Sequence, residues 1–349
     1  MINKQTYEKE YIEKLQTKSK NDPMLIERTI FAFGLLEALV RVQLPFVFKG
    51  GTCLMLLLNE PKRLSTDIDI IVSKETDIDD YINKASEIFP FLKVKEQVRK
   101  GKNNIVKRHF HFTYESPTSK KPLTILLDVL FQENKYTKTI KIEIKNDLLK
   151  IDEPHYSVLV PTAECILGDK LTAFAPHTTG ILLGEDKDLE VMKQMFDCAC
   201  IMDVVEDFAN IKDTYHKIVE AEIAYRGLNI TFKEVLLDTI NAAMCLMSRG
   251  LSNPDDYEYF IKGIDGLKAH IFSGKYSGEK AISDAAKIFY IATAILTNKE
   301  TLIKIEDGNR YRDVLIKNKK YSKIAKVRKV DLIAHGYIIE GIKNLREEI

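Results

Sequence analysis

The chain has 349 residues, enough for two domains, and its hydrophobic content of 45% is ordinary for a globular protein. Lysine and arginine total 52 and aspartate and glutamate 51, so the net charge of +1 excludes a global attraction to nucleic acid or membrane. No apolar stretch is long enough to span a bilayer, and the charged N-terminus lacks a signal-peptide core, so we expect a cytoplasmic protein without membrane contact and with reduced cysteines.

The first half of the chain mixes helical and strand patterns. Apolar residues at helical spacing predict an amphipathic helix over 24–42. β-branched, apolar or alternating runs predict strands, and shorter helices lie between them. The expected strands are 46–48, 67–72, 107–114, 123–131 and 138–145, and the expected shorter helices are 53–58 and 78–89. Strand 107–114 alternates basic with aromatic residues, which indicates one exposed face, and 138–145 is typical of an edge strand.

The character of the chain changes after Pro161. From there on, the apolar periodicity is helical and is punctuated by glycine and proline. The expected helices are 162–175, 188–208, 212–225, 231–250, 255–272 and 281–297. We therefore predict an α+β protein with a mixed-sheet α/β domain over 1–157 and a helical domain over 158–349.

The segment 46–72 has the pattern of a phosphate site. A short strand leads into Gly50 and Gly51, which let backbone N–H groups approach a ligand closely. A helix follows directly, with Thr52 as its expected cap, so its positive end should face the same space. This arrangement predicts that Gly50, Gly51 and Thr52 bind nucleotide phosphates.

A pair of carboxylates follows on the next expected strand. Asp67 and Asp69 are two residues apart, so their side chains should point to the same side of that strand. Close carboxylates repel unless a cation lies between them, and oxygen ligands with substrate phosphates suit Mg²⁺, with Mn²⁺ as the alternative. The plainer interpretation is a glycine turn followed by surface aspartates.

Asp128 is a candidate third metal ligand. It lies within an apolar strand, between Leu127 and Val129. A carboxylate in such surroundings is costly to bury unless it meets a cation or a hydrogen-bond donor. A lysine or arginine from elsewhere in the chain is the alternative partner.

The motifs K-G-G-T at 49–52 and L-S-T-D-I-D-I at 64–70 closely resemble the AbiEii/AbiGii, or MenT-type, toxin family. These proteins are nucleotidyltransferases of the DNA polymerase β-like superfamily. The resemblance implies a polymerase β-like nucleotidyltransferase domain that uses an NTP and a divalent metal. It also implies a place in a toxin–antitoxin or abortive-infection system, with a cognate antitoxin.

Two further stretches resemble motifs of the same family. Residues 163–173, A-E-C-I-L-G-D-K-L-T-A, are similar to its K-L-x-A helix, and this similarity implies that Lys170 contacts nucleotide phosphates. Residues 193–197, K-Q-M-F-D, are similar to a K-D-x-x-D motif, in which Gln194 replaces the usual aspartate. Asp197 is the best match to the family's acid, and Asp188 is the alternative.

Other residues allow two interpretations each. Ser65 either caps the turn before the strand or contacts the nucleotide. Arg63 either reaches a phosphate or lies in a solvated loop, and His177 has a structural or a substrate-lining role. The lysine-dense segment 317–329 is either an RNA contact or a solvated tail.

The preferred prediction is a metal-dependent nucleotidyltransferase toxin that modifies an RNA acceptor, with the 3′ end of tRNA as the leading candidate. One alternative is a nucleotidyltransferase that acts on a small molecule or a protein hydroxyl. The other is a nucleotide-binding module without catalysis, which the intact Asp67, Asp69 and Asp128 disfavour.

Overall fold

The computed structural model describes residues 1–58, 60–98 and 106–349, and it divides into two compact units. The first unit comprises Met1–Thr162 together with Ala269–Gly274, and the second comprises Ala163–Lys268 together with Lys275–Ile349. Within the described ranges, no helix combines the length and the apolar character needed to cross a membrane.

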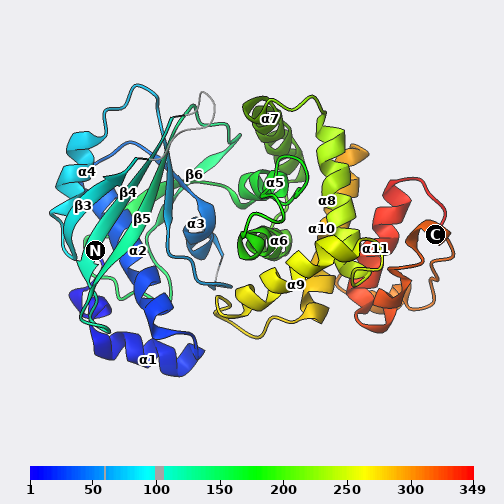
Figure 1. The fold of residues 1–349 in the computed structure, drawn as a ribbon, viewed down its shortest axis with the longest axis horizontal. Helices are drawn as coiled ribbons and strands as arrows, with labels where there is room; N and C mark the ends of the chain where they lie inside the picture. The colour runs from blue at the N-terminus through cyan, green and yellow to red at the C-terminus, as the bar shows by residue number, and fades with distance from the viewer. Residues whose placement is uncertain (59, 99–105) are drawn as a thin grey trace. The chain divides into compact units, whose positions relative to one another are not determined.

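A five-stranded mixed sheet forms the centre of the first unit (Figure 1). Its strands are β1 (Val47–Lys49), β2 (Ile68–Val72), β3 (Phe91–Gln97), β4 (Val106–Glu115) and β5 (Pro122–Phe131). The spatial order is β1-β2-β5-β4-β3. Only the pair β2–β5 is parallel, and the other three pairs are antiparallel. A separate two-stranded sheet pairs β6 (Thr139–Glu143) with β7 (Ser157–Pro161), and β7 contacts β1.

Helices cover one face of the main sheet. The helices of this unit are α1 (Lys9–Ser19), α2 (Pro23–Arg41), α3 (Gly50–Leu57) and α4 (Asp79–Ser86). Helix α2 packs on β2 and β5, and α4 packs on β3. Alternate side chains of β4, Phe110, Phe112 and Tyr114, are buried on one face, and Phe31 of α2 stacks on Tyr114 with ring centroids 3.8 Å apart. Because strand side chains alternate between faces, the remaining β4 side chains lie on the opposite face.

The second unit is helical. Its helices are α5 (Ala163–Ala173), α6 (Asp188–Met202), α7 (Phe208–Arg226), α8 (Phe232–Met247), α9 (Pro254–Lys268), α10 (Gly278–Leu296) and α11 (Leu332–Asn344). Helix α10 contacts α6, α8, α9 and α11, and most of its side chains are buried, so it forms the core of this unit. Helix α5 packs between α6 and α7.

The expected fold class is confirmed: a mixed sheet with helices precedes a helical part. The structure adds α1, β3, β7 and α11, which the sequence patterns did not predict. Strand β6 is an edge strand, as expected, but of the small second sheet rather than of the main one.

The lysine-dense segment 317–329 is not a solvated tail. It forms the short 3₁₀ helices Lys319–Tyr321 and Ala325–Lys329, and Tyr321, Ile324 and Val327 are buried.

Candidate active site

The site in the first unit begins where β1 passes directly into α3. The helix starts at Gly50, whose φ of +85° lies in the left-handed region that favours glycine. A side chain at Gly50 would collide with the carboxylate of Asp69. A Cβ atom at Gly51 would lie 2.6 Å from Nη2 of Arg63 and 2.7 Å from Oγ of Ser65. Both glycines are therefore required by close packing, and Asp69 and Ser65 lie beside the start of α3.

Thr52 is not the helix cap that the sequence predicted. Lys49 occupies the N-cap position, and Thr52 lies inside the first turn of α3. Its Oγ1 donates a hydrogen bond of 2.7 Å to the backbone carbonyl of Asp67. Thr52 thus joins the start of α3 to the residue that precedes β2, and it holds the two parts of the predicted site together.

The sheet register brings Asp69 and Asp128 side by side. Asp69 is paired with Lys49 on β1 and with Asp128 on β5, and Asp128 is paired with His109 on β4. In-register neighbours on adjacent strands have their side chains on the same face. Lys49, Asp69, Asp128 and His109 therefore form one row across four strands. Asp67 lies two residues before Asp69, at the end of β2 nearest Thr52.

Asp128 is bonded to a histidine, which the sequence did not predict. Nδ1 of His109 lies 2.6 Å from Oδ1 of Asp128. A carboxylate only accepts hydrogen bonds, so the ring nitrogen that faces it carries the proton and donates. The side chain of Asp128 is 35% exposed, so it is not buried among apolar residues as its strand suggested. Its second oxygen remains available for a further donor or cation.

Arg63 does not lie in a solvated loop. Its side chain is buried, and Nη1 donates a hydrogen bond of 3.2 Å to the carbonyl of Leu64. The guanidinium lies next to Gly51, as the close approach of Nη2 shows. The local sequence around Arg63 could not predict this burial. Arg63 forms a β-bridge with Ile271, which is more than 200 positions away in the chain.

Lys170 and Asp197 are brought together in the second unit. Nζ of Lys170 lies 2.8 Å from Oδ2 of Asp197, and both side chains are almost fully buried. The same ammonium donates a hydrogen bond of 3.1 Å to Oε1 of Gln194. Gln194, which replaces the family's aspartate, thus still accepts a bond from Lys170 but adds no charge. Lys170 is therefore not an ordinary solvated helix lysine.

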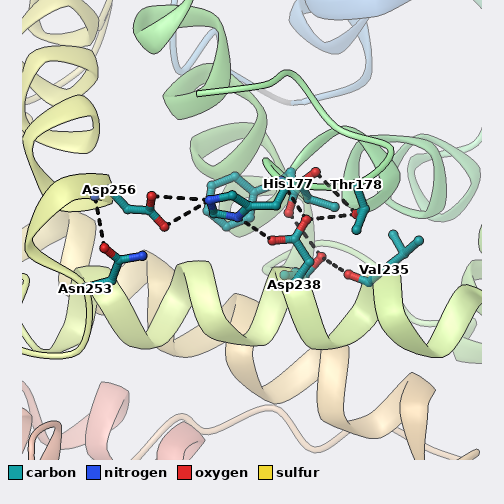
Figure 2. A network of polar contacts seen from close by, with 9 residues as sticks. His177, Thr178, Val235, Asp238, Asn253 and Asp256 are labelled. Carbon is teal, nitrogen blue, oxygen red and sulfur yellow. Dashed lines mark hydrogen bonds and ion pairs between the residues drawn. The ribbon is translucent and has the colours of Figure 1, made fainter. Parts of the chain in front are cut away.

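His177 lies between two carboxylates, as Figure 2 shows. Nδ1 is 2.9 Å from Asp238 on α8, and Nε2 is 3.2 Å from Asp256 on α9. The backbone N–H of His177 and the hydroxyl of Thr178 also donate to Asp238, both at 2.8 Å. Burial alone would lower the pKa of His177, but the two carboxylates outweigh it and the pKa is raised. Of the two interpretations of His177, these contacts favour the structural one.

In the described part of the chain, no group of three or more His, Cys, Asp or Glu residues stands ready to hold a metal ion. The hydrogen bond from His109 accounts for the orientation of Asp128. Asp67 and Asp69 remain as two carboxylates beside a glycine-initiated helix. Mg²⁺ is commonly held in this way, by one or two carboxylates together with substrate phosphates rather than by a complete protein cage.

Comparison with known proteins identifies the class of protein and its family. The family model for the AbiEii nucleotidyl transferase toxin of type IV toxin–antitoxin systems matches residues 35–284. The chain is therefore a nucleotidyltransferase, and it belongs to the AbiEii family, whose membership implies an antitoxin partner. The matched range includes the carboxylates of β2 and β5 as well as Lys170 and Asp197.

Two solved structures from Helicobacter pylori are similar to the chain. One is JHP933 and the other is described as a candidate nucleotidyltransferase. Each is 12% identical, covers 78% of this chain and has a TM-score of 0.45, and the match covers 93% and 96% of those chains, respectively. No curated protein sequence matches this chain. The family assignment therefore depends on the match over residues 35–284.

Proposed function

We propose that this protein transfers a nucleotidyl group from an NTP to the end of an RNA, with a tRNA 3′ end as the leading acceptor, in a metal-dependent reaction. The observation that carries the proposal is the position of Asp67 and Asp69 at the start of β2, beside a helix that begins with two glycines. A metal-binding carboxylate pair and a phosphate-binding helix end are the two parts that such a reaction requires.

The start of α3 holds the triphosphate. The first turn of a helix has N–H groups without partners inside the helix, and they favour an anion. Gly50 and Gly51 have no side chains that would block this approach, and Ser65 lies next to Gly51. Thr52 keeps this turn in position against Asp67. Gly50, Gly51, Thr52 and Ser65 therefore form the nucleotide-binding part of the proposal.

Asp67, Asp69 and Asp128 would hold Mg²⁺ or Mn²⁺. The carboxylate pair suits such an ion together with substrate phosphates, and the register places Asp128 beside Asp69 on one face of the sheet, where it would complete the donor set. When bound, the metal neutralises charge on the triphosphate and polarises the reacting phosphate.

The protein's own residues orient the acceptor and receive its proton. The acceptor hydroxyl oxygen attacks the α-phosphorus, and a new O–P bond forms. The bond from the α-phosphorus to the bridging oxygen breaks, and pyrophosphate leaves with the electron pair. The oxygen of Asp128 that is not bonded to His109 accepts the hydroxyl proton, while His109 fixes the orientation of the carboxylate.

Lys170 is included in the proposal because the family resemblance of its helix implies contact with the nucleotide phosphates. The ammonium of Lys170 stabilises negative charge on the nucleotide phosphates, and Asp197 and Gln194 hold it in position. The acceptor assignment is supported by the family resemblance of the motifs around Gly50, Asp67 and Lys170.

The test is to incubate the protein with each α-labelled NTP, Mg²⁺ and total RNA. We expect label in RNA of tRNA size with one preferred NTP, and at least about 100-fold less label with Asp69→Ala. The free energy of unfolding of Asp69→Ala in metal-free buffer should change by no more than about 1 kcal/mol. Label on a protein or a small molecule would overturn the RNA acceptor, and full transfer by Asp69→Ala would overturn the site.

A further inference from the structure

The face of the sheet that carries Asp128 continues into basic residues on β4 and β3. On β4, Lys107 and His111 lie two residues before and after His109, so their side chains share its face. On β3, the register places Lys95 opposite His111 and Lys93 opposite Thr113. We call Lys93, Lys95, Lys107 and His111 the basic strip.

The basic strip faces away from the covering helices. The buried aromatic side chains of β4 lie on the other face, where Tyr114 stacks on Phe31 of α2. Glu96 of β3 lies on that helix-covered face as well. There, Arg108 forms ion pairs of 2.7 Å with Glu96 and of 2.7 Å with Asp79 of α4. Lys93, Lys95 and Lys107 are exposed. The strip is therefore an open, positively charged surface. It lies on β3 and β4, which are paired neighbours in the sheet (Figure 1).

The strip itself contains no acidic side chain. Between Lys93 and Gln97 and between Lys107 and Thr113, the strip face carries no aspartate or glutamate. Glu115 follows at the far end of β4, where it lines a pocket with Tyr7 and Phe31. Among the described residues, neither Lys93 nor Lys95 has an ion-pair partner. A chain with a net charge of only +1 thus has a local positive field beside its carboxylate row.

We propose that the basic strip binds the phosphate backbone of the acceptor RNA strand and leads its end to Asp128. This inference rests on the proposed function. Residues two apart on a strand are about 7 Å from each other, and neighbouring strands are about 5 Å apart, so the strip spans several phosphates. Two strand spacings, about 10 Å, separate β3 from β5. A strand held by its phosphates on the strip therefore reaches the carboxylate row with its terminal nucleotide.

The basic strip is suited to single-stranded RNA and does not select a base sequence. The aromatic rings of β4 are buried on the opposite face and offer no surface for base stacking. Lysine is a flexible point charge and contacts phosphates without reading base edges. The strip thus supplies affinity, while the choice of acceptor is left to the residues around the terminal nucleotide.

The second lysine-rich segment provides a matched control. Lys320 forms an ion pair of 2.7 Å with Glu347, and Lys323 donates to the carbonyl of Leu251 at 2.8 Å. These cations already have partners in the second unit. Replacing Lys319, Lys320 and Lys323 by glutamine changes the net charge as much as replacing Lys93, Lys95 and Lys107, so the comparison separates the place of the lost charge from its amount.

The experiment measures binding of a labelled single-stranded RNA of about 20 nucleotides to the wild-type protein and both triple variants, without NTP, over a range of salt concentrations. Each lost phosphate contact lowers the salt slope by about 0.7 log units, so three lost contacts lower it by about 2. Between 50 and 200 mM salt, the wild-type protein should then lose about 20-fold more affinity than K93Q/K95Q/K107Q. K319Q/K320Q/K323Q should keep the wild-type slope. Thermal melting should show both variants folded.

The outcomes separate this inference from the proposed function. Transfer of label to RNA by the wild-type protein, combined with an unchanged salt slope in K93Q/K95Q/K107Q, would overturn the strip and leave the function standing. Absence of RNA labelling by the wild-type protein would overturn the function itself. Competition by poly-glutamate as strong as competition by RNA would overturn the RNA assignment and identify an acidic protein as the occupant. Reduced RNA binding with unchanged binding of a fluorescent NTP analogue supports the strip.

Discussion

At the scale of single residues, the contact between His109 and Asp128 is the most informative one in the first unit. It fixes one carboxylate oxygen and leaves the other for the reaction. Partners of this kind orient metal-binding side chains, and their loss usually lowers metal affinity or activity by about 10–100-fold. We therefore expect His109→Ala to raise the Mg²⁺ concentration needed for half-maximal transfer by about 10–100-fold. A titration of Mg²⁺ at saturating NTP measures this concentration.

Asparagine is the matched replacement at this position. Its amide nitrogen can occupy the place of Nδ1 and donate to Asp128, so His109→Asn should recover most of the wild-type metal dependence. His111, whose Nε2 is 3.0 Å from Gln97, serves as the control. If His109→Ala and His111→Ala shift the Mg²⁺ dependence equally, His109 has no positioning role.

The buried pair of Lys170 and Asp197 combines stability with activity. Removing one partner of a buried ion pair leaves the other charge uncompensated, which costs about 3–5 kcal/mol. Lys170→Met should therefore lower the free energy of unfolding by about that amount and also abolish transfer. The double variant Lys170→Met/Asp197→Leu should regain most of the stability but none of the activity, because a neutral pair packs well and cannot hold phosphate charge.

Chemical denaturation and transfer assays measure the two effects separately. The exposed pair of Lys268 and Asp265, 2.6 Å apart, is the control, and Lys268→Met should change the stability by less than about 1 kcal/mol. A double variant with wild-type transfer would show that the pair serves the fold alone.

At the scale of elements, the loop after α5 is fixed to α8 and α9 by His177. The raised pKa of His177 in the folded protein means that the protonated form is stabilised by Asp238 and Asp256. A group with a raised pKa contributes its full stability below its unfolded pKa, near 6.5, and loses it as the pH rises through the folded value. The stabilisation by His177 should therefore decline from pH 6.5 upward.

The measurement is the melting temperature of wild type and His177→Gln between pH 6 and pH 9. The difference between them should be largest at pH 6 and should shrink as the pH rises. Asp238 keeps its bonds from Thr178 and from the backbone of residue 177, so the variant should remain folded. A difference that is constant over this range would exclude a titrating contact.

The elements that the sequence predicted well are those with strong local patterns. The apolar run of β5 and the β-branched run of β2 identified their strands, and a glycine or proline begins α2, α3, α9 and α10. Strand β3 was missed because it is an edge strand whose sequence, F-L-K-V-K-E-Q, has only one buried residue, Phe91. Its pairing with β4, not its own composition, makes it a strand.

The candidate site was only partly predictable for a similar reason. Gly50, Asp67 and Asp69 lie within 20 residues of one another, and local spacing was enough to connect them. The row that joins Asp69 to Asp128 and His109 depends on the register of strands that are distant in the chain. The burial of Arg63 likewise depends on its pairing with Ile271. No local pattern contains such long-range contacts.

At the scale of the whole molecule, family membership predicts harm to a bacterial host, and the cause of that harm can be tested. Harm caused by transfer requires the carboxylates, whereas harm caused by binding RNA or a partner does not. Asp69→Ala removes a carboxylate from the row without touching the basic strip or the Lys170 pair. We therefore expect induced wild-type protein to arrest growth, and Asp69→Ala at equal abundance to allow growth at the rate of an empty vector. Arrest by Asp69→Ala at the wild-type level would favour the alternative of a binding module without catalysis, and no arrest by the wild-type protein at high abundance would argue against toxicity.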